Sequence, residues 1–181
     1  MSAARSNNDA GVRPAVAPDI DALIELASTT FHDTYRDTDD PADIALYIAR
    51  NFTRPAFEEI LADDSMLLLV IEIAGRLVGY LQVKRSPAPA CVTGPRPIEL
   101  ARLYLRQDTQ GMGLGAALMR ATHAEARRQA CETIWLVVYS RNDKARDFYR
   151  RWGFADVGLK DFQFGGTVYS DPVMSAPVPS A

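Results

Sequence analysis

Cysteine is scarce in this sequence. Only Cys91 and Cys131 occur among its 181 residues, which is too few for a disulfide framework or for a zinc site built on cysteine. We therefore expect no metal centre and a reducing, cytoplasmic setting. Cys91 falls in a predicted loop and Cys131 at a predicted helix–strand junction, so neither is expected to act as a nucleophile.

Long hydrophobic runs and an excess of positive charge are also missing. No stretch of about 18 uncharged apolar residues is present, so no membrane span is predicted. The opening residues MSAARSNNDAG lack the apolar core of a signal peptide. Twenty Lys and Arg residues against 23 Asp and Glu residues give a net charge of -3, which argues against nucleic acid as a partner. Any anionic ligand must therefore be held by local features.

The length and composition are typical of one globular domain. The chain is 48% hydrophobic and 24% charged, and single domains cluster near about 100–150 residues. We expect a domain over residues 12–174. The small, polar residues 1–11 and the proline-rich residues 175–181 are expected to be flexible termini.

The hydrophobic pattern predicts a mixed order of strands and helices. Asp19 is predicted to cap the first helix, and Pro55 is predicted to interrupt the helical region before it. The expected elements are a strand at 11–16, a helix after residue 19, one or two helices at 41–62, a hairpin of strands 66–73 and 77–84, a strand at 98–105, a helix at about 114–129, a strand at 133–139, a helix at 143–152 and strands near 154–162 and 166–174. This order predicts an α/β fold with one mixed sheet and helices on its faces.

A glycine-rich loop between strand 98–105 and the following helix is the most informative feature. Gly111, Gly113 and Gly115 permit positive φ angles and let the backbone approach a ligand closely. The helix that begins there presents unpaired N–H groups and the positive end of its dipole. The loop therefore predicts a phosphate cradle, and the alternative is a glycine-rich turn without a ligand.

Two common phosphate ligands fit this loop poorly. A P-loop requires Lys followed by Ser or Thr, whereas Ala116 and Ala117 follow the last glycine. The spacing of Gly111, Gly113 and Ala116 formally satisfies the dinucleotide pattern. However, residues 106–110 separate the glycines from the strand, and too few strands precede the loop for a doubly wound sheet. Neither a kinase-like nucleotide nor a dinucleotide is therefore predicted.

Two motifs resemble the GCN5-related N-acetyltransferase (GNAT) superfamily. The first is Gln110-x-x-Gly113-x-Gly115, which follows a strand, and the second is NDKARDFYRRWGF at residues 142–154. They stand in the family's order and spacing. The resemblance implies a central mixed, mostly antiparallel twisted sheet of about seven strands flanked by helices, with a splayed parallel strand pair that holds acyl-CoA.

The resemblance also implies the residues that bind acetyl-CoA. Strand backbone would pair with the pantetheine arm, loop amides would hold the pyrophosphate, Asn142 would contact the arm besides capping a helix, and Lys144 would reach the 3′-phosphoadenosine end. Because Gln110 and Met112 replace the usual basic residues, amides and the helix dipole must supply most of the attraction. The implied set is Leu103, Tyr104, Leu105, Gln110, Gly111, Met112, Gly113, Leu114, Gly115, Ala116, Asn142 and Lys144.

Tyr149 and Glu99 are the implied catalytic residues. Tyr149 corresponds to the residue that faces the departing sulfur, although a tyrosine beside Phe148 could equally be a core residue. Glu99 is a candidate base for the attacking ammonium, whose ordinary pKa of about 10.4 lies ~3.4 units above neutral pH, and its plain alternative is an exposed charge at a strand end. His123 is expected to be an exposed helix residue.

The acceptor is predicted to be a small primary amine that attacks directly in a ternary complex. A narrower resemblance to bacterial spermidine/spermine acetyltransferases, at residues 30–35, 45–52 and 99–105, implies a polyamine-like acceptor contacted by Phe31, His32 and Tyr35. Two alternatives stay open. The acceptor could instead be a protein N-terminus, a lysine or an antibiotic, or the chain could be a non-enzymatic acyl-CoA-binding module. A homodimer is possible within the family.

Overall fold

The computed structural model describes residues 11–180, so residues 1–10 of the predicted N-terminal segment lie outside it. Seven strands form one sheet in the order β1-β2-β3-β4-β5-β7-β6. Only β4 and β5 pair in parallel, and the other pairs are antiparallel. The strands are β1 (Gly11–Pro14), β2 (Met66–Ile73), β3 (Arg76–Lys84), β4 (Pro97–Leu105), β5 (Thr133–Val137), β6 (Ala155–Phe164) and β7 (Thr167–Pro177).

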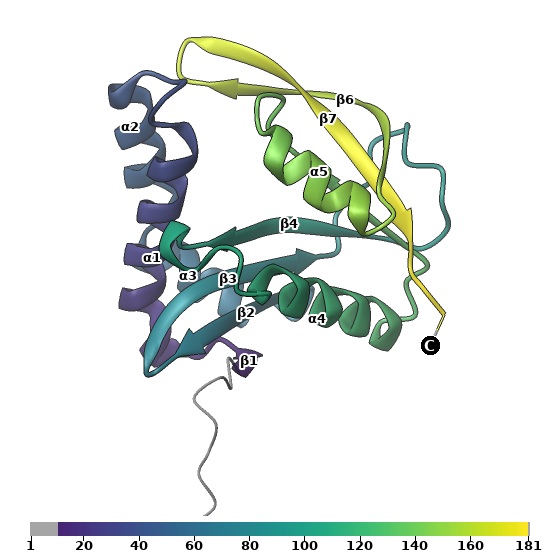
Figure 1. The fold of residues 1–181 in the computed structure, drawn as a ribbon, viewed down its shortest axis with the longest axis horizontal. Coiled ribbons are helices and arrows are strands. Elements are labelled where there is room, and N and C mark those ends of the chain that lie inside the picture. Colours follow the sequence, from purple (N-terminus) through teal and green to yellow (C-terminus); the bar gives the residue numbers. More distant parts are fainter. Residues whose placement is uncertain (1–10, 181) are drawn as a thin grey trace, which may run out of the picture.

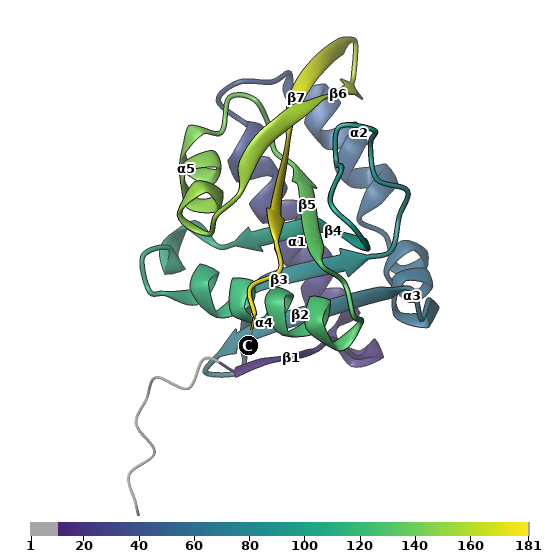
Figure 2. The ribbon, with the colours of Figure 1, turned by 90° about the vertical axis from the view of Figure 1, so that its right-hand side faces the viewer.

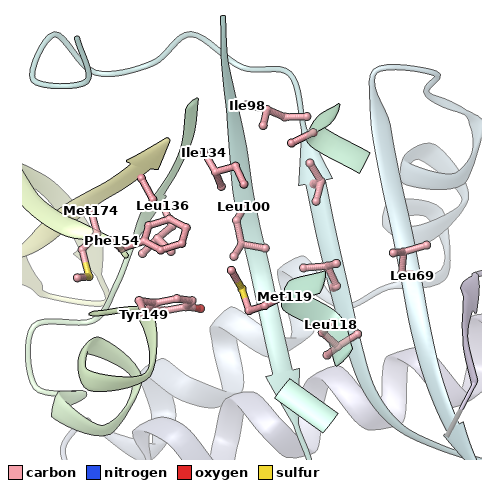
Figure 3. Packing of buried hydrophobic residues seen from close by; sticks show 14 of the residues in the cluster. Leu69, Ile98, Leu100, Leu118, Met119, Ile134, Leu136, Tyr149, Phe154 and Met174 are labelled. Carbon is pink, nitrogen blue, oxygen red and sulfur yellow. The ribbon is translucent and has the colours of Figure 1, made fainter. Parts of the chain in front are cut away.

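Five α-helices cover the two faces of this sheet (Figure 1). They are α1 (Ile20–Tyr35), α2 (Pro41–Asn51), α3 (Arg54–Ala62), α4 (Leu114–Arg128) and α5 (Asp143–Arg151), with short 3-10 turns at Ala17–Asp19 and Gln107–Thr109. Side chains of α1, α2 and α3 bury one face of the sheet. Those of α4 and α5 bury the other face (Figure 3). The fold class expected from the sequence is confirmed.

Local chemistry explains where several elements begin and end. The β2–β3 hairpin turns at Ala74 (φ 49°) and Gly75 (φ 79°), two left-handed residues in succession, as a tight hairpin requires. Thr53 caps α3 by accepting a hydrogen bond from the Ala56 amide. The predicted interruption before Pro55 is thus a boundary between two helices.

The parallel pairing of β4 with β5 is short. It covers Pro97–Glu99 against Thr133–Trp135, and β4 then carries a bulge at Ala101, where its register with β3 shifts. A bulge bends a strand and increases its local twist. After the bulge β4 stays with β3, whereas the chain beyond β5 follows β7, with the Val138 amide donating to the Pro172 carbonyl at 3.0 Å. The two strands therefore separate (Figure 2).

Three predictions from the sequence are wrong in detail. The Asp19 side chain does not cap α1; it accepts hydrogen bonds from Arg13 and from the Val16 amide instead. His123 is buried, with its ring edge-on to Trp152. The predicted C-terminal tail starts too early, because β7 continues to Pro177, which pairs with Thr133.

No helix within residues 11–180 is both long enough and apolar enough to cross a membrane.

Candidate active site

A row of backbone groups on β4 faces the space left by β5. The Arg106 amide donates to the Val78 carbonyl at 2.9 Å, and hydrogen-bonding direction alternates along an antiparallel strand. Tyr104 therefore also bonds toward β3. The amides and carbonyls of Leu103 and Leu105 point the other way, into the gap. Buried backbone groups need partners, so an extended ligand arm fits beside these two residues.

A cavity of about 530 Å³ runs from this gap to the glycine loop. It brings together most of the residues that the sequence predicted for acetyl-CoA, although Met112 is 54% exposed and lies outside it. The cavity is lined by Thr34, Leu103, Tyr104, Leu105, Gln110, Gly111, Gly113, Leu114, Gly115, Ala116, Asn142, Lys144, Ala145, Phe148, Tyr149, Arg151 and Trp152.

The glycine loop leaves the first turn of α4 without a cap. Gly113 precedes the helix with φ 79°, and no side chain accepts from the first helical amides. Gly111 also has a positive φ of 86°. Gly115 serves a different purpose, because a Cβ there would come within 3.2 Å of the Phe148 ring. The loop thus presents unpaired amides and a positive helix end to the cavity, as a phosphate group requires.

Few basic side chains lie at this loop. Lys144 donates to the Gln110 side chain, which joins α5 to the loop across the cavity. Arg106 instead pairs with Glu25 at 2.8 Å. Arg151, which the sequence reasoning did not single out, lines the cavity together with Lys144. Backbone amides and these two cations therefore supply the attraction for an anion.

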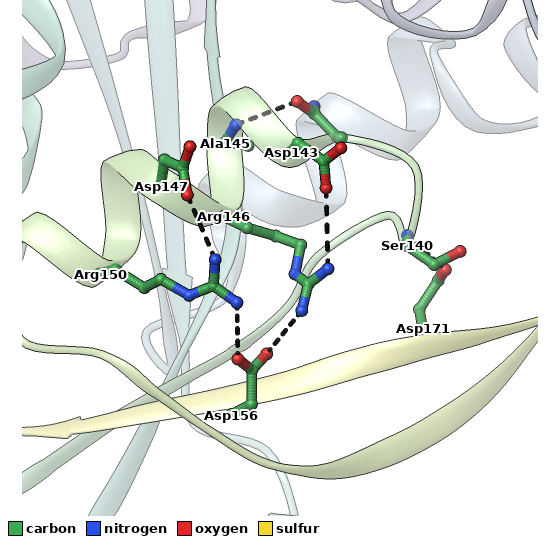
Figure 4. A network of polar contacts seen from close by, with 9 residues as sticks. Ser140, Asp143, Ala145, Arg146, Asp147, Arg150, Asp156 and Asp171 are labelled. Atoms are coloured by element: carbon green, nitrogen blue, oxygen red, sulfur yellow. Dashed lines mark hydrogen bonds and ion pairs between the residues drawn. The ribbon is translucent and has the colours of Figure 1, made fainter.

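Helix α5 is held by polar contacts at both ends (Figure 4). Asn142 caps it by accepting from the Ala145 amide at 3.0 Å, which confirms the predicted cap. Further along the helix, Arg146 and, near the C-terminal end, Arg150 both contact Asp156 of β6, at 3.4 and 3.0 Å. The hydrogen bond from Arg150 lowers the pKa of the Asp156 carboxyl. The helix is thus fixed relative to the sheet that it covers.

Tyr149 projects from α5 toward β4 (Figure 3). Its ring packs between Phe148 and Phe154, and only 8% of the residue is exposed. Burial raises the pKa of the Tyr149 phenol well above its ordinary value of 10.0. At neutral pH the side chain is therefore a neutral hydrogen-bond donor within the cavity.

Two smaller cavities adjoin the large one. One of about 90 Å³ lies between the separated strands and is bordered by Tyr149 from one face of the sheet and by Tyr35 and Arg102 from the other. The other, of about 230 Å³, includes Asp33, Thr38, Arg141 and Lys144. Thr34 and Asn142 border all three. The gap therefore connects a long cavity on the α4 and α5 side with a small cavity on the α1 side.

Three predicted site residues lie elsewhere. Phe31 is buried in the core, stacked on Tyr47 with ring centroids 4.3 Å apart, and His32 is exposed beside Asp33. Glu99 accepts a hydrogen bond from Ser86 and lies 3.4 Å from the Lys84 ammonium. None of the three borders the cavities described above.

The structure also brings in residues that the sequence reasoning missed. Arg102 could have been noticed as a charge in the middle of an apolar strand. Phe148 and Arg151 lie in α5 within the second motif, on either side of Tyr149. The remaining two carry no local signal, because they reach the site from the end of α1 and from the segment after β5. The missed residues are Thr34, Arg102, Tyr139, Phe148 and Arg151.

Comparison with known proteins identifies the family. Residues 20–154 match the acetyltransferase (GNAT) family. The chain belongs to this family. It is 32% identical over 156 residues to an uncharacterized N-acetyltransferase of Mycobacterium tuberculosis, covering 86% of this chain and 96% of the relative. It is also 25% identical to an uncharacterized N-acetyltransferase of Lactobacillus delbrueckii subsp. lactis, covering 84% and 88%.

Solved structures agree on the fold of this GNAT protein. The PaiA N-acetyltransferase of Thermoplasma acidophilum, solved with coenzyme A, has a TM-score of 0.75 at 20% identity, covering 92% of this chain and 98% of that one. The free Leu103 and Leu105 backbone, the uncapped α4 and the connecting cavity fit coenzyme A. The protein is therefore an acetyl-CoA-dependent N-acetyltransferase.

We expect Gly113→Ala to weaken coenzyme A binding, because an alanine Cβ disfavours φ 79° and would move the loop amides. The strain costs about 1–2 kcal/mol. Gly75→Ala is the matched control, since Gly75 has the same φ and equally open surroundings but lies in the β2–β3 turn. Both variants should lose similar stability in urea unfolding, while calorimetry should show weaker coenzyme A binding only for Gly113→Ala. Equal affinity in the two variants would contradict the assigned cradle.

Proposed function

We propose that this enzyme transfers the acetyl group of acetyl-CoA directly to a small primary amine while both substrates are bound. When bound, acetyl-CoA supplies the activated acetyl thioester. The observation that carries the proposal is the position of Tyr149, which borders both the long cavity and the small cavity across the gap. One donor thus stands where a cofactor arm and an acceptor from the other face of the sheet would meet.

Tyr149 is suited to stabilise charge on a departing sulfur. A thiol titrates near about 8.5 and an unperturbed phenol near about 10, so complete proton transfer from phenol to thiolate is uphill by roughly 2 kcal/mol. Burial increases that difference, because it raises the pKa of Tyr149 further. The phenol therefore acts mainly as a hydrogen-bond donor whose contribution grows as negative charge develops.

Direct transfer is favoured because the cavities offer no cysteine nucleophile. Cys131 is buried, and its thiol lies 3.8 Å from the Gln129 carbonyl at the end of α4. Cys91 packs near Gly158 of β6. Neither borders the three cavities. The attacking group in this proposal is the amine itself.

The attacking amine must first lose a proton. An ordinary ammonium has a pKa of about 10.4, so presenting the neutral amine at pH 7 costs about 4.6 kcal/mol. Glu99 stays our proposed base: it pairs in register with Lys84 of β3, which puts it on the α1 to α3 face with Arg102. Because Glu99 lies outside the small cavity, it would take the proton through water.

The class of amine is not determined by the family. The polyamine-like acceptor remains a prediction from the sequence, as do the protein, lysine and antibiotic alternatives. The cavity of about 230 Å³ is lined by Asp33 together with the cations Arg141 and Lys144. The lining of this cavity therefore offers a polycation little net attraction. A panel that includes spermidine, spermine, lysine peptides and aminoglycosides, read by release of free thiol, separates these classes. Coenzyme A binding without thiol release on any amine would favour a binding module.

Tyr149→Phe should reduce turnover by roughly 10²–10³-fold, the range found when one transition-state donor is removed. Acetyl-CoA affinity should change little, because the ring remains. Tyr80→Phe is the control, since it removes another buried phenol hydroxyl from the α1 to α3 core, and it should keep full activity. Steady-state kinetics on the best amine measure both variants. Unchanged turnover in Tyr149→Phe would contradict the role of Tyr149 as a hydrogen-bond donor to the departing sulfur.

Glu99→Gln should lower kcat/KM at pH 7 by about 10²-fold if Glu99 serves as the base. The loss should shrink toward pH 9.5, because a growing share of the amine is already neutral there. Ser86→Ala, which removes only the hydrogen bond to Glu99, should have a small effect. A loss of the same size at every pH would show that Glu99 acts on structure instead.

A further inference from the structure

Arg102 occupies an unusual place for a charged side chain. It lies in the middle of β4, in register with Gln82 of β3, and its guanidinium carbon sits 5.4 Å from the centre of the Phe52 ring. It therefore points to the face covered by α1, α2 and α3. There it borders the 90 Å³ cavity between the separated strands, together with Tyr35, Tyr139 and Tyr149.

This guanidinium lacks a counter-charge within residues 11–180. Its Nη1 atom is buried and has no hydrogen-bond partner. Arg106, four residues further along the chain and just past the end of β4, is by contrast paired with Glu25 at 2.8 Å. Leaving a buried cationic donor unpaired is costly. The unpartnered position of the Arg102 guanidinium therefore costs the folded protein free energy.

Within the described part of the chain, no acidic residue lines the small cavity beside Arg102, and the acidic groups in neighbouring parts of the fold are engaged elsewhere. Glu99 is bonded to Ser86 and Lys84. Asp39 accepts hydrogen bonds from Tyr139 and Tyr169 at 3.0 and 2.6 Å. Asp171 accepts from the Ser140 amide at 2.9 Å. The protein thus supplies no carboxylate to this side of the cavity.

The other ionisable neighbours of Arg102 are phenols that stay neutral. Burial raises the pKa of Tyr104 to about 12 and that of Tyr47 above its ordinary value. Tyr80, stacked on Tyr104, is fully buried as well. None of these tyrosines can balance the guanidinium near neutral pH. The missing negative charge must come from a ligand.

We propose that Arg102 binds a carboxylate of the acceptor, so that the substrate is a small amino acid-like amine. This inference rests on the acetyl transfer proposed above and names its substrate class. A guanidinium matches a carboxylate with two parallel hydrogen bonds. One positive charge balances one carboxylate, whereas a phosphate monoester carries about −1.5 to −2 at pH 7.

The dimensions of the site agree with this class. Arg102 and Tyr149 border the same cavity of about 90 Å³, so the carboxylate and the reacting amine belong to one compact molecule. Tyr35 and Tyr139 also border this cavity and pack against each other, with their ring centroids 4.9 Å apart. A simple polyamine would instead place an ammonium group beside an unpaired guanidinium. Arg102 therefore selects against the acceptor that the sequence predicted.

The test compares each common α-amino acid with its carboxamide as acceptor, with spermidine included. We expect the acids to have kcat/KM values about 10- to 100-fold higher than the amides. Arg102→Gln should abolish this preference through KM, and Arg102→Lys should keep part of it. Arg106→Gln, which removes a nearby arginine outside the cavity, should preserve it. A preference for carboxamides or spermidine, or an unchanged preference in Arg102→Gln, would overturn the inference.

A binding measurement separates this inference from the proposed reaction. Calorimetry with coenzyme A present should detect N-acetyl-amino acids but not their amides, and Arg102→Gln should lose that binding while its coenzyme A affinity stays unchanged. If no amine tested causes thiol release, but this product binding is seen, the proposed reaction is refuted and the carboxylate site is supported. If amines without a carboxylate are acetylated and no product binding depends on Arg102, the proposed reaction is supported and the carboxylate site is refuted.

Discussion

Three residue pairs hold β4 against β5, and the position where that pairing stops decides the rest of the site. After Glu99 the two strands share no ladder, and the bulge at Ala101 turns β4 away. The backbone groups of Leu103 and Leu105 are left facing a gap. A sheet normally satisfies such groups with a neighbouring strand. In the proposed complex an extended cofactor arm would take that position, so cofactor binding would complete the sheet.

In the proposed reaction the same gap would let the two substrates meet while each is bound in its own cavity. The α4 and α5 face carries the glycine loop and Tyr149, while the α1 to α3 face carries Arg102. Each face has its own hydrophobic core, so the two walls are fixed independently. The Arg150–Asp156 contact fixes α5 relative to β6. Tyr149 can therefore hold a constant position at the opening between both sides.

Much of this arrangement could be predicted from the sequence, because its signals are local. Glycines at 111 and 113 require positive φ, and the strand and helix beside them have regular hydrophobic periods. Asp19 and His123 were mispredicted because their partners, Arg13 and Trp152, come from other elements. Arg102 stands out in the sequence as a charge in an apolar strand, but its lack of a partner appears only in the folded chain. A missing partner is a property of the folded chain.

The charge distribution connects the two ends of the site. The chain carries a net charge of -3, yet Lys144 and Arg151 border the long cavity and Arg102 the small one. These three cations attract negative groups into the cavities on both sides of the gap, although the net charge of the chain is negative. At the loop, amides supply much of that attraction at no desolvation cost to a side chain. At Arg102 only a ligand can supply the missing charge. The free energy lost by leaving its buried Nη1 atom without a partner is recovered when a carboxylate binds, and an acceptor without a carboxylate cannot recover it.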